Sequence, residues 1–423
     1  MKLTEYLNKG KSAYHIVKTA SAQLKNAGFT ELDFSKPFEL SENGAYYVTP
    51  FPTVLFAFRI NERITDGRMH IACAHTDFPC FHVKPSAQLN STEYIRINVE
   101  PYGGMLKKTW FDRPLGVCGQ VILRSDNPYQ PEEMLFDSEE PWFIIPSLAP
   151  HLDREIEKKE LDIQKEMMPL FSLASDNKST DNLFLNAIAD KLKVNISDIL
   201  DFDLYLYLTE KSCPVGYNNT LLSAPRIDNI ASCAALSESL IKGTHKDADI
   251  SMIALFNNEE IGSRSKQGAD SALLSWLLEK IFESALIKQY ELNYKDSVAK
   301  SMLLSVDGAH GVHPNYTEKS DITSQAILGN GFVVKTSSSQ RYVTDSRATA
   351  IIISLCKENN IDVQRQANRS GAPGGQTLGP IVSSYLPVLA ADIGIPMLAM
   401  HSARELISSK DYSSLCNFLN IWL

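Results

Sequence analysis

Four short apolar runs in the sequence end in side chains that can bind metal ions. The runs MHIACAHTD, SMIALFNNEE, LLSVDGAH and PMLAMHSARE deliver, just past their last apolar residues, His75, Glu260, Asp307 and His401. The carboxyl ends of parallel strands meet at one edge of an open α/β sheet, so neighbouring parallel strands would bring these side chains into one crevice. A single acid or histidine at a strand end is more often a solvated terminus. Four such strand ends in one chain favour a shared binding site over solvated termini alone.

A fifth acid completes a ligand set for two metal ions. Asp228 lies in SAPRIDNIASCAAL, where a loop that contains proline leads into an expected helix. Two histidines and three carboxylates suit zinc, with cobalt or manganese as alternatives. If Asp228 bridges, one ion takes His75 and Asp307, and the other takes Glu260 and His401. Room then remains for a shared water, and such an open position is typical of a catalytic metal site.

Two further acids beside these ligands fit supporting roles. Asp77 follows His75 by two residues and is placed to accept the other ring N–H of that histidine, which would fix its tautomer. Adjacent residues of an extended chain point to opposite sides, so we expect Glu260 to bind metal while Glu259 faces the substrate. Glu259 is then the natural general base, which takes a proton from water and passes it to a leaving amine.

The elements that must position these residues indicate an α/β fold. Each of the four runs is typical of a buried strand, and SALLSWLLEKIFESALIKQYEL repeats apolar residues at helical spacing. Strands that alternate with helices predict a mixed open sheet sandwiched by helices. The segments YIRINVEPYGG, PLGVCGQVILRS, PWFIIPSL and DFDLYLYL instead alternate apolar and polar residues, as strands do. We interpret residues 83–216 as an inserted β-rich domain, and residues 1–82 and 217–423 as the α/β domain.

Composition and charge exclude other classes of protein. The 423 residues are 44% hydrophobic and carry a net charge of −9 without a Lys/Arg-rich block, so we expect no nucleic-acid partner. No apolar stretch has the length of a membrane span, and the first residues lack the apolar run of a signal peptide. The seven cysteines are scattered, which favours reduced thiols. We therefore expect a cytoplasmic protein with no membrane partner.

At these motifs the sequence resembles the aspartyl aminopeptidase family of co-catalytic two-zinc metallo-aminopeptidases. The likeness runs along nearly the whole chain and is carried by AHTD, YGG with TWFDRPLG, SAPRIDN, NNEEIGS, VDGAHGVHPNY, QRYVTDS, GQTLGPI and DIGIPMLAMHSARE. It implies a hydrolase that removes N-terminal residues from peptides and favours Asp or Glu at that position. It also implies the same five ligands and the same base, an inserted dimerisation domain, and dimers that build a tetrahedral dodecamer.

The resemblance adds four residues to the expected site. His310, Lys335 and Tyr342 match family positions that contact substrate, and His151 matches a histidine contributed to a neighbouring subunit's site. A lysine can pair with a substrate carboxylate, and a tyrosine can donate to the oxyanion of a tetrahedral intermediate. On composition alone, Lys335 is more typical of a solvated strand end and Tyr342 of a packed surface aromatic.

The sequence also departs from the family pattern. Asn257 and Asn258 replace an Asp-His pair, Met105 and Lys107 interrupt a stretch that usually carries Gly and Trp, and Gln376 replaces a serine. Such residues beside a site can tune its preference for acidic N-terminal residues. Two alternatives remain open: a two-metal deacylase or other amidohydrolase on the same core, and a non-catalytic assembly or scaffold protein. Hydrolysis of N-acylated amino acids would indicate the first, and absence of bound metal the second.

Overall fold

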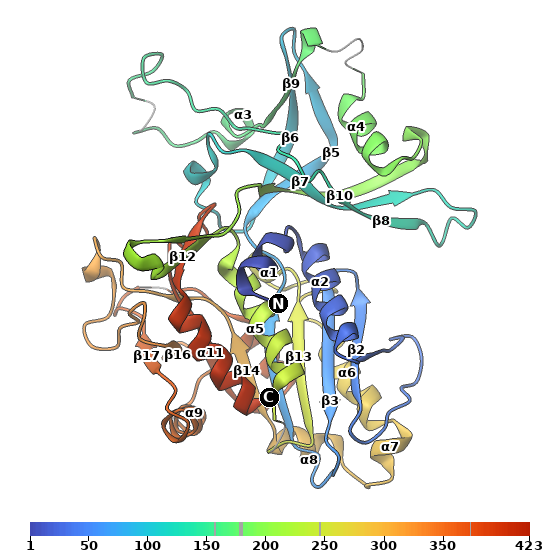
Figure 1. The fold of residues 1–423 in the computed structure, drawn as a ribbon, viewed down its shortest axis with the longest axis vertical. Coiled ribbons are helices and arrows are strands. Elements are labelled where there is room, and N and C mark those ends of the chain that lie inside the picture. Colours follow the sequence, from blue (N-terminus) through green and yellow to red (C-terminus); the bar gives the residue numbers. More distant parts are fainter. Residues whose placement is uncertain (156–157, 177–180, 245–246, 373) are drawn as a thin grey trace. The chain divides into compact units, whose positions relative to one another are not determined.

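The chain divides into two compact units. The structure, a computed structural model, describes residues 1–155, 158–176, 181–244, 247–372 and 374–423. The first unit comprises Met1–Asp77, Ser212–Met400 and Glu405–Leu423, and the second comprises Phe78–Lys211 and His401–Arg404. Each unit is built around a sheet of its own (Figure 1).

A nine-stranded mixed sheet forms the centre of the first unit. Its strands, in spatial order, are β1 (Thr30–Glu31), β2 (Ala45–Phe51), β3 (Val54–Ile60), β13 (Ile250–Phe256), β4 (Met69–His75), β14 (Met302–Val306), β18 (Leu389–Gly394), β16 (Phe332–Thr336) and β17 (Val363–Ala367). The pairs β13–β4, β4–β14 and β14–β18 are parallel, whereas β3–β13 and β18–β16 are antiparallel. The central strands are buried at every residue except His70 of β4, which is partly buried, as expected of strands covered on both faces.

Helices cover both faces of this sheet, which confirms the predicted α/β sandwich (Figure 1). One face carries α1 (Leu3–Lys9), α2 (Ala13–Asn26), α5 (Ile227–Lys242) and α11 (Ser409–Trp422). The other shares a large apolar cluster with α6 (Leu273–Phe282), α7 (Ala285–Lys288), α8 (Tyr294–Lys300) and α10 (Leu378–Tyr385). A further helix, α9 (Ser346–Glu358), packs against β18. The helix predicted over 271–292 breaks between α6 and α7, because the Ser284 hydroxyl accepts the Ile287 N–H and caps a new helix.

A small five-stranded sheet also belongs to the first unit. Its strands, in spatial order, are β11 (Cys213–Val215), β12 (Leu221–Ala224), β20 (Glu405–Ser408), β19 (Pro396–Leu398) and β15 (Ala309–His310). The apolar run at 396–405 does not join the main sheet, so the four runs of the sequence are not all parallel neighbours in one sheet. The preceding strand, β18, already occupies the position next to β14, so β19 pairs with β15 and β20 instead.

The second unit contains a six-stranded sheet in which every pairing is antiparallel. Its strands, in spatial order, are β8 (Glu132–Asp137), β7 (Leu115–Leu123), β10 (Ile199–Leu208), β5 (Cys80–Asn90), β6 (Tyr94–Tyr102) and β9 (Leu170–Leu173). Two helices accompany it, α3 (Ile163–Glu166) and α4 (Leu183–Leu192). The strand predicted in PWFIIPSL is wrong, because Phe143 and Ile144 form only isolated bridges. Its prolines cannot donate to a continuous ladder.

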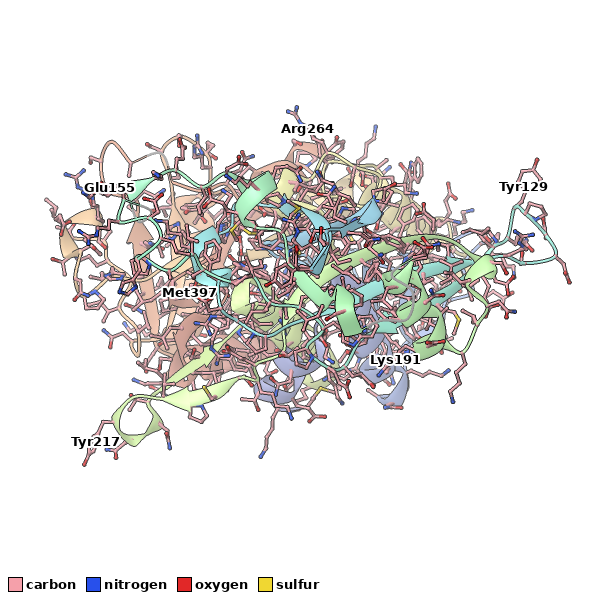
Figure 2. All side chains as sticks on the ribbon, turned by 90° about the horizontal axis from the view of Figure 1, so that it is seen from above. Tyr129, Glu155, Lys191, Tyr217, Arg264 and Met397 are labelled. Carbon is pink, nitrogen blue, oxygen red and sulfur yellow. The ribbon has the colours of Figure 1, made fainter. Side chains whose placement is uncertain are left out.

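Short 3₁₀ turns connect these elements. They are η1 (Lys107–Trp110), η3 (Ala174–Asp176), η4 (Ile196–Asp198), η5 (Tyr217–Asn219), η6 (Glu259–Ile261) and η7 (Thr317–Lys319). Figure 2 labels two of the most exposed aromatic side chains, Tyr129 at 95% and Tyr217 at 90% exposure, each at the tip of a hairpin loop. Among the described residues, every helix falls short of the length or the apolar character that a membrane span requires.

Candidate active site

Strand register brings His75 and Asp307 to the same level of the main sheet. Cys73 of β4 pairs with Ser305 of β14. His75 and Asp307 each follow their paired residue by two positions, so they lie at the same level. The Nε2 atom of His75 lies 3.5 Å from Asp307 Oδ1 and 3.5 Å from Asp228 Oδ1. One side-chain donor atom from each of these three residues lies within 4.8 Å of the other two. This cluster therefore joins three segments that are far apart in the sequence.

Asp228 reaches the cluster from the first turn of α5. Its N–H donates to Glu405 Oε2 at 3.0 Å, and the neighbouring Asn229 side chain donates to the Val306 carbonyl at 2.9 Å. These bonds attach the start of the helix to β20 and to the end of β14. Asp228 is 4% exposed, and the main chain that carries its carboxylate is thus fixed by contacts from two strands.

The two glutamates after β13 lie in a 3₁₀ turn rather than in an extended chain. Asn258 adopts a left-handed conformation, with φ of 61°, and this bends the chain into the turn. One donor atom from each glutamate lies within 4.8 Å of the other and of a His75 ring nitrogen. The expectation that Glu259 and Glu260 point to opposite sides is therefore wrong, since both carboxylates face the same centre.

Asp77 supports both halves of this cluster. Its main-chain carbonyl lies 3.0 Å from His75 Nδ1, and its carboxylate oxygen lies 3.4 Å from the same nitrogen. The carboxylate also accepts the N–H groups of Glu259 at 3.1 Å and Glu260 at 3.0 Å. One buried acid thus connects the end of β4 to the turn that follows β13.

The charges in this cluster perturb one another strongly. Burial disfavours the charged form of His75, but the Asp228, Asp307 and Asp77 carboxylates outweigh it and raise the pKa of His75 well above its usual range. Burial raises the pKa of Glu259 to about 8, with the Asp307 and Asp77 charges adding to it and the His75 charge opposing it. The site therefore attracts positive charge.

The donor set of the first unit fits a divalent cation. The short contact from His75 Nδ1 to the Asp77 carbonyl assigns the ring proton to Nδ1, which leaves the Nε2 lone pair facing Asp228 and Asp307. Imidazole nitrogen with carboxylate oxygens is a donor set that zinc accepts. A cation here would also neutralise acids that otherwise crowd one buried space.

His401 belongs to the second unit, in the segment His401–Arg404. It has a left-handed backbone, with φ of 66°, and its Nδ1 lies 3.0 Å from the Gly104 carbonyl. Its main-chain carbonyl accepts the Leu106 N–H at 2.9 Å. As in His75, a main-chain carbonyl at Nδ1 leaves the Nε2 lone pair as the donor for a ligand.

A buried ammonium group, that of Lys335, binds the main chain of the residue that follows Asp307. Lys335 on β16 is 1% exposed, donates to the Gly308 carbonyl at 2.9 Å, and lies 5.0 Å from the centre of the Tyr342 ring. Burial disfavours its charge, but the Asp307 and Asp392 carboxylates more than compensate and raise the pKa of Lys335. Lys335 is therefore a buried cation rather than a solvated strand end, and Tyr342 is 4% exposed.

Sequence reasoning missed Asp392, a carboxylate that is 0% exposed on β18. It accepts the Thr377 hydroxyl at 2.5 Å and the Val343 N–H at 2.6 Å. These bonds connect β18 to the residue after Tyr342 and to the residue that precedes α10. The signal was present as a single acid inside the apolar stretch VLAADIGIPM, where a buried charge requires several partners.

The two remaining histidines of the expected site, His151 and His310, are both exposed. His151 is exposed in a turn of the second unit. His310 on β15 is also exposed, three residues after Asp307, and lines a cavity of the first unit. The structure therefore brings together His75, Asp77, Asp228, Glu259, Glu260 and Asp307, and it describes His151 and His401 with the other unit.

The fold and the buried donor set are those of a metal-dependent hydrolase, and comparison with known proteins identifies the family. The profile of the Aminopeptidase I zinc metalloprotease (M18) family matches residues 6–422, so the chain belongs to the M18 family. It is a metallo-aminopeptidase, a hydrolase. A Clostridium novyi protein, "Probable M18 family aminopeptidase 2", is 37% identical over 413 residues, which cover 97% of this chain and 95% of that protein.

Solved structures share the fold over nearly the whole chain. A chain of the Ape4 and Nbr1 complex superposes with a TM-score of 0.93 at 28% identity, covering 99% of this chain and 84% of that one. The S. cerevisiae mApe1 dodecamer gives a TM-score of 0.84 at 25% identity, covering 99% of this chain and 94% of that one. The aminopeptidase of Thermotoga maritima, at 20% identity and a TM-score of 0.84, shares the fold.

Proposed function

We propose that this aminopeptidase uses two zinc ions to hydrolyse the first peptide bond of peptides, and that it favours Asp or Glu at the N-terminus. The observation that carries the proposal is the gathering of His75, Asp228 and Asp307 with both glutamates beyond three parallel neighbouring strands. The carboxyl end of parallel strands is where open α/β sheets bind their ligands.

The two ions divide the ligands between them in this proposal. His75 and Asp307 hold one ion, Glu260 and His401 hold the other, and Asp228 is shared. Cobalt or manganese could replace zinc, because the same nitrogen and oxygen donors suit all three metals. Bound ions of this kind supply Lewis acidity toward the scissile carbonyl oxygen and the attacking water.

Glu259 carries the proton between the reactants. Its carboxylate takes a proton from water as the water oxygen attacks the carbonyl carbon. It then gives that proton to the amine nitrogen as the C–N bond breaks, which releases one amino acid and a peptide shorter by one residue. The N–H bonds to Asp77 support this role, because they hold the main chain of Glu259 in one orientation.

The preference for an acidic first residue rests on the buried cation and on the family resemblance. Lys335 supplies a charge that opposes a substrate carboxylate, and Tyr342 stands beside it as a donor for the oxyanion. His310 adds a substrate contact, and His151 completes the site of a neighbouring copy of the chain. Asn257 and Asn258 replace family residues next to the base, and we expect them to weaken the preference without abolishing it.

Self-association is part of this proposal. The mApe1 relative is a dodecamer, and we propose that this chain likewise forms dimers that build a tetrahedral dodecamer, with residues 83–216 as the dimerisation domain. Exposed aromatic side chains such as Tyr129 and Tyr217 support association, because such residues are enriched at protein interfaces. The scattered cysteines fit a cytoplasmic protein with reduced thiols.

A peptide panel tests the proposal directly. Peptides that differ only in the first residue, Asp, Glu, Asn or Ala, are incubated with the protein loaded with zinc, cobalt or manganese, and the released amino acids are measured. We expect release from all four, fastest from Asp and Glu, and none from N-acetylated forms. Equal rates for Asp and Asn peptides would remove the acidic preference. Cleavage of the acetylated peptides would instead indicate a deacylase or another amidohydrolase.

A further inference from the structure

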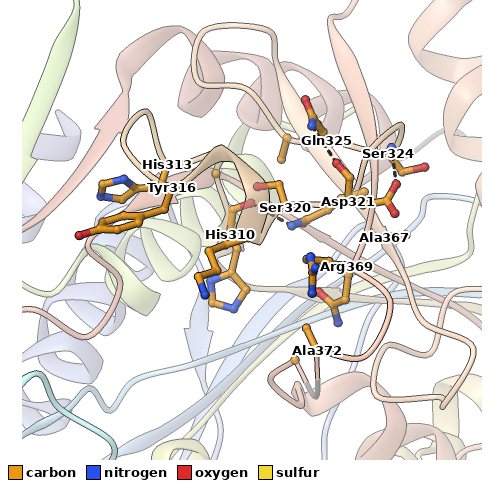
Figure 3. A pocket seen from close by; sticks show the side chains of 16 residues that line it. His310, His313, Tyr316, Ser320, Asp321, Ser324, Gln325, Ala367, Arg369 and Ala372 are labelled. Atoms are coloured by element: carbon orange, nitrogen blue, oxygen red, sulfur yellow. Dashed lines mark hydrogen bonds between the residues drawn. The ribbon is translucent and has the colours of Figure 1, made fainter.

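The first unit contains a cavity of about 310 Å³, and His310 is one of the residues that line it. Figure 3 shows the side chains of His310 and Arg369 among those that line this cavity, and the rings of His313 and Tyr316 next to each other. The ring centres of that aromatic pair lie 5.0 Å apart. The wall thus combines an aromatic surface with polar side chains from two segments of the chain, one between His310 and Ala326 and one that begins at Gln366.

The charges that line the cavity favour an anion. Lys319 and Arg369 both line it, and neither has an ion-pair partner within the part of the chain that the structure describes. The single acid of the wall, Asp321, accepts the N–H groups of Ser324 at 2.7 Å and Thr323 at 3.0 Å. Both bonds hold the Oδ1 atom of this carboxylate within its own turn, and no ion pair joins Asp321 to Lys319 or Arg369 among the described residues. The two cations are therefore available to a bound carboxylate.

A buried amide in the same wall offers an acceptor. Gln366 is 6% exposed, and its Nε2 donates to the His310 carbonyl at 2.9 Å. Its Oε1 is buried and accepts no hydrogen bond from any residue that the structure describes. A buried acceptor without a donor is costly, so a ligand N–H at this position would be favourable. The cavity therefore presents cations for a carboxylate and an acceptor for an N–H group.

The cavity lies within reach of a short peptide, because His310 lines it and is close in sequence to Asp307. His310 follows Asp307 by three residues, and three residues of chain span at most about 11 Å. Two or three substrate residues beyond the cleaved bond cover the same distance in extended form. A peptide whose first residue is at the metal ligands is thus long enough to extend to the level of His310.

We propose that this cavity binds the C-terminal carboxylate of short peptide substrates, with Arg369 and Lys319 as the cations and Gln366 as the acceptor for the last N–H. The chain then acts preferentially on tripeptides and tetrapeptides with a free carboxyl end. This proposal rests on the aminopeptidase function proposed above, and it adds a second point of recognition at the opposite end of the peptide.

A matched pair of substrates tests it. A tripeptide acid and its C-terminal amide, identical otherwise, are compared by KM and kcat in the zinc-loaded enzyme. We expect KM for the acid to be about fivefold lower, an effect limited by the exposure of Arg369 and Lys319. In Arg369→Ala and in Lys319→Ala this ratio falls toward one, and Arg369→Lys restores part of it. Equal KM values for acid and amide in the unmodified enzyme would overturn the proposal.

Arg365 provides the control. It lies on β17 next to Gln366 and is exposed, and adjacent strand residues point to opposite faces, so Arg365→Ala removes the same charge without altering the cavity wall. Its acid-to-amide ratio should stay at fivefold, and a fall equal to that of Arg369→Ala would reduce the effect to net charge and contradict the proposal.

The two proposals can fail separately. If the enzyme cleaves neither peptide, the aminopeptidase function fails, and calorimetric binding of the same acid and amide to zinc-loaded Glu259→Gln still tests the cavity. Tighter binding of the acid supports the cavity site, and equal binding contradicts it.

Discussion

The two units of the chain treat charge in opposite ways. The first unit buries a histidine, several carboxylates and a lysine, among them His75, Lys335 and Asp392, each no more than 1% exposed. In the second unit, no charged side chain is buried among the described residues, and its ion pairs, such as Arg113 with Glu210 at 2.8 Å, are partly solvated. Burying a charge costs several kcal/mol before its partners compensate.

This difference indicates that the first unit carries the reactive groups and that the second unit has a structural role. The second unit is stabilised by apolar packing, in which the rings of Phe143, Phe171, Phe184 and Phe202 contact one another. Strongly perturbed and buried ionisable groups are instead typical of active sites. Burial of charge alone would therefore direct attention to the first unit without any knowledge of relatives. Variants in the two units should consequently fail in different ways.

The largest effect is expected for Glu259→Gln in the first unit. The amide cannot take up a proton, so kcat should fall by about 10³-fold, equivalent to about 4 kcal/mol of transition-state stabilisation. Zinc content, measured by elemental analysis, should not change. The exposed Glu283→Gln should leave both quantities as they are. Undiminished turnover in Glu259→Gln would eliminate it as the proton carrier.

A cavity in the second unit should reduce stability and leave the metal site intact. Phe184 is 1% exposed among three aromatic rings, so Phe184→Ala should destabilise the second unit by about 3 kcal/mol, which denaturant unfolding would measure. Zinc stoichiometry should remain that of the unmodified chain. Tyr129→Ala, at a 95% exposed position, should change stability by less than about 0.5 kcal/mol. Loss of zinc in Phe184→Ala would contradict the view that packing in the second unit does not affect the metal site.

Asp392→Asn should affect stability and activity together, since Asp392 belongs to the buried charges of the first unit. Removing this carboxylate weakens charged hydrogen bonds from Thr377 and Val343, and we expect a loss of about 2 kcal/mol in unfolding free energy. Lys335 also loses a compensating charge, so KM for Asp peptides should rise more than KM for Ala peptides. Equal changes for both peptides would reduce Asp392 to a purely structural role.

The smallest effect concerns His82 in the second unit. Burial opposes its charge, but Asp203, at 2.9 Å, and Glu100 outweigh this and raise the pKa of His82. A raised folded pKa means that the stabilisation is complete below the unfolded pKa near 6.5 and is lost as pH rises through the folded value. Because these side chains are partly exposed, the loss should be under about 1 kcal/mol.

Unfolding of the second unit at pH 6 and at pH 9 measures this effect. The pH dependence should be smaller in His82→Gln, which has no titrating ring. An identical dependence in both proteins would assign it to other groups.

Much of the main sheet could be predicted, because the strands that carry His75, Asp307 and the glutamate pair are continuous apolar runs with an abrupt polar end. Such runs must be covered on both faces, and this predicts helices on each side. The place of His401 could not be predicted in the same way. A three-residue extended piece such as Pro396–Leu398 carries no information about which sheet it joins, since that depends on which edges are already occupied.

The side-chain directions at the site were harder to predict than its residue types. The turn at Glu259 and Glu260 depends on the left-handed Asn258, and sequence alone does not distinguish that conformation from a continued strand. Asp392 was missed because a single acid in an apolar stretch looks like a strand end until its partners are known. Those partners, Thr377 and Val343, come from distant segments that only the folded chain brings near.

Asp77 ties the histidine of one strand to the glutamate pair beyond the next strand through a single side chain and its own carbonyl. We therefore expect the two strand ends to move together, so that the distance between His75 and Glu259 varies little. A reaction that depends on this distance is then little affected by motions of the sheet. Replacement of Asp77 would let the end of β4 and the turn after β13 move independently.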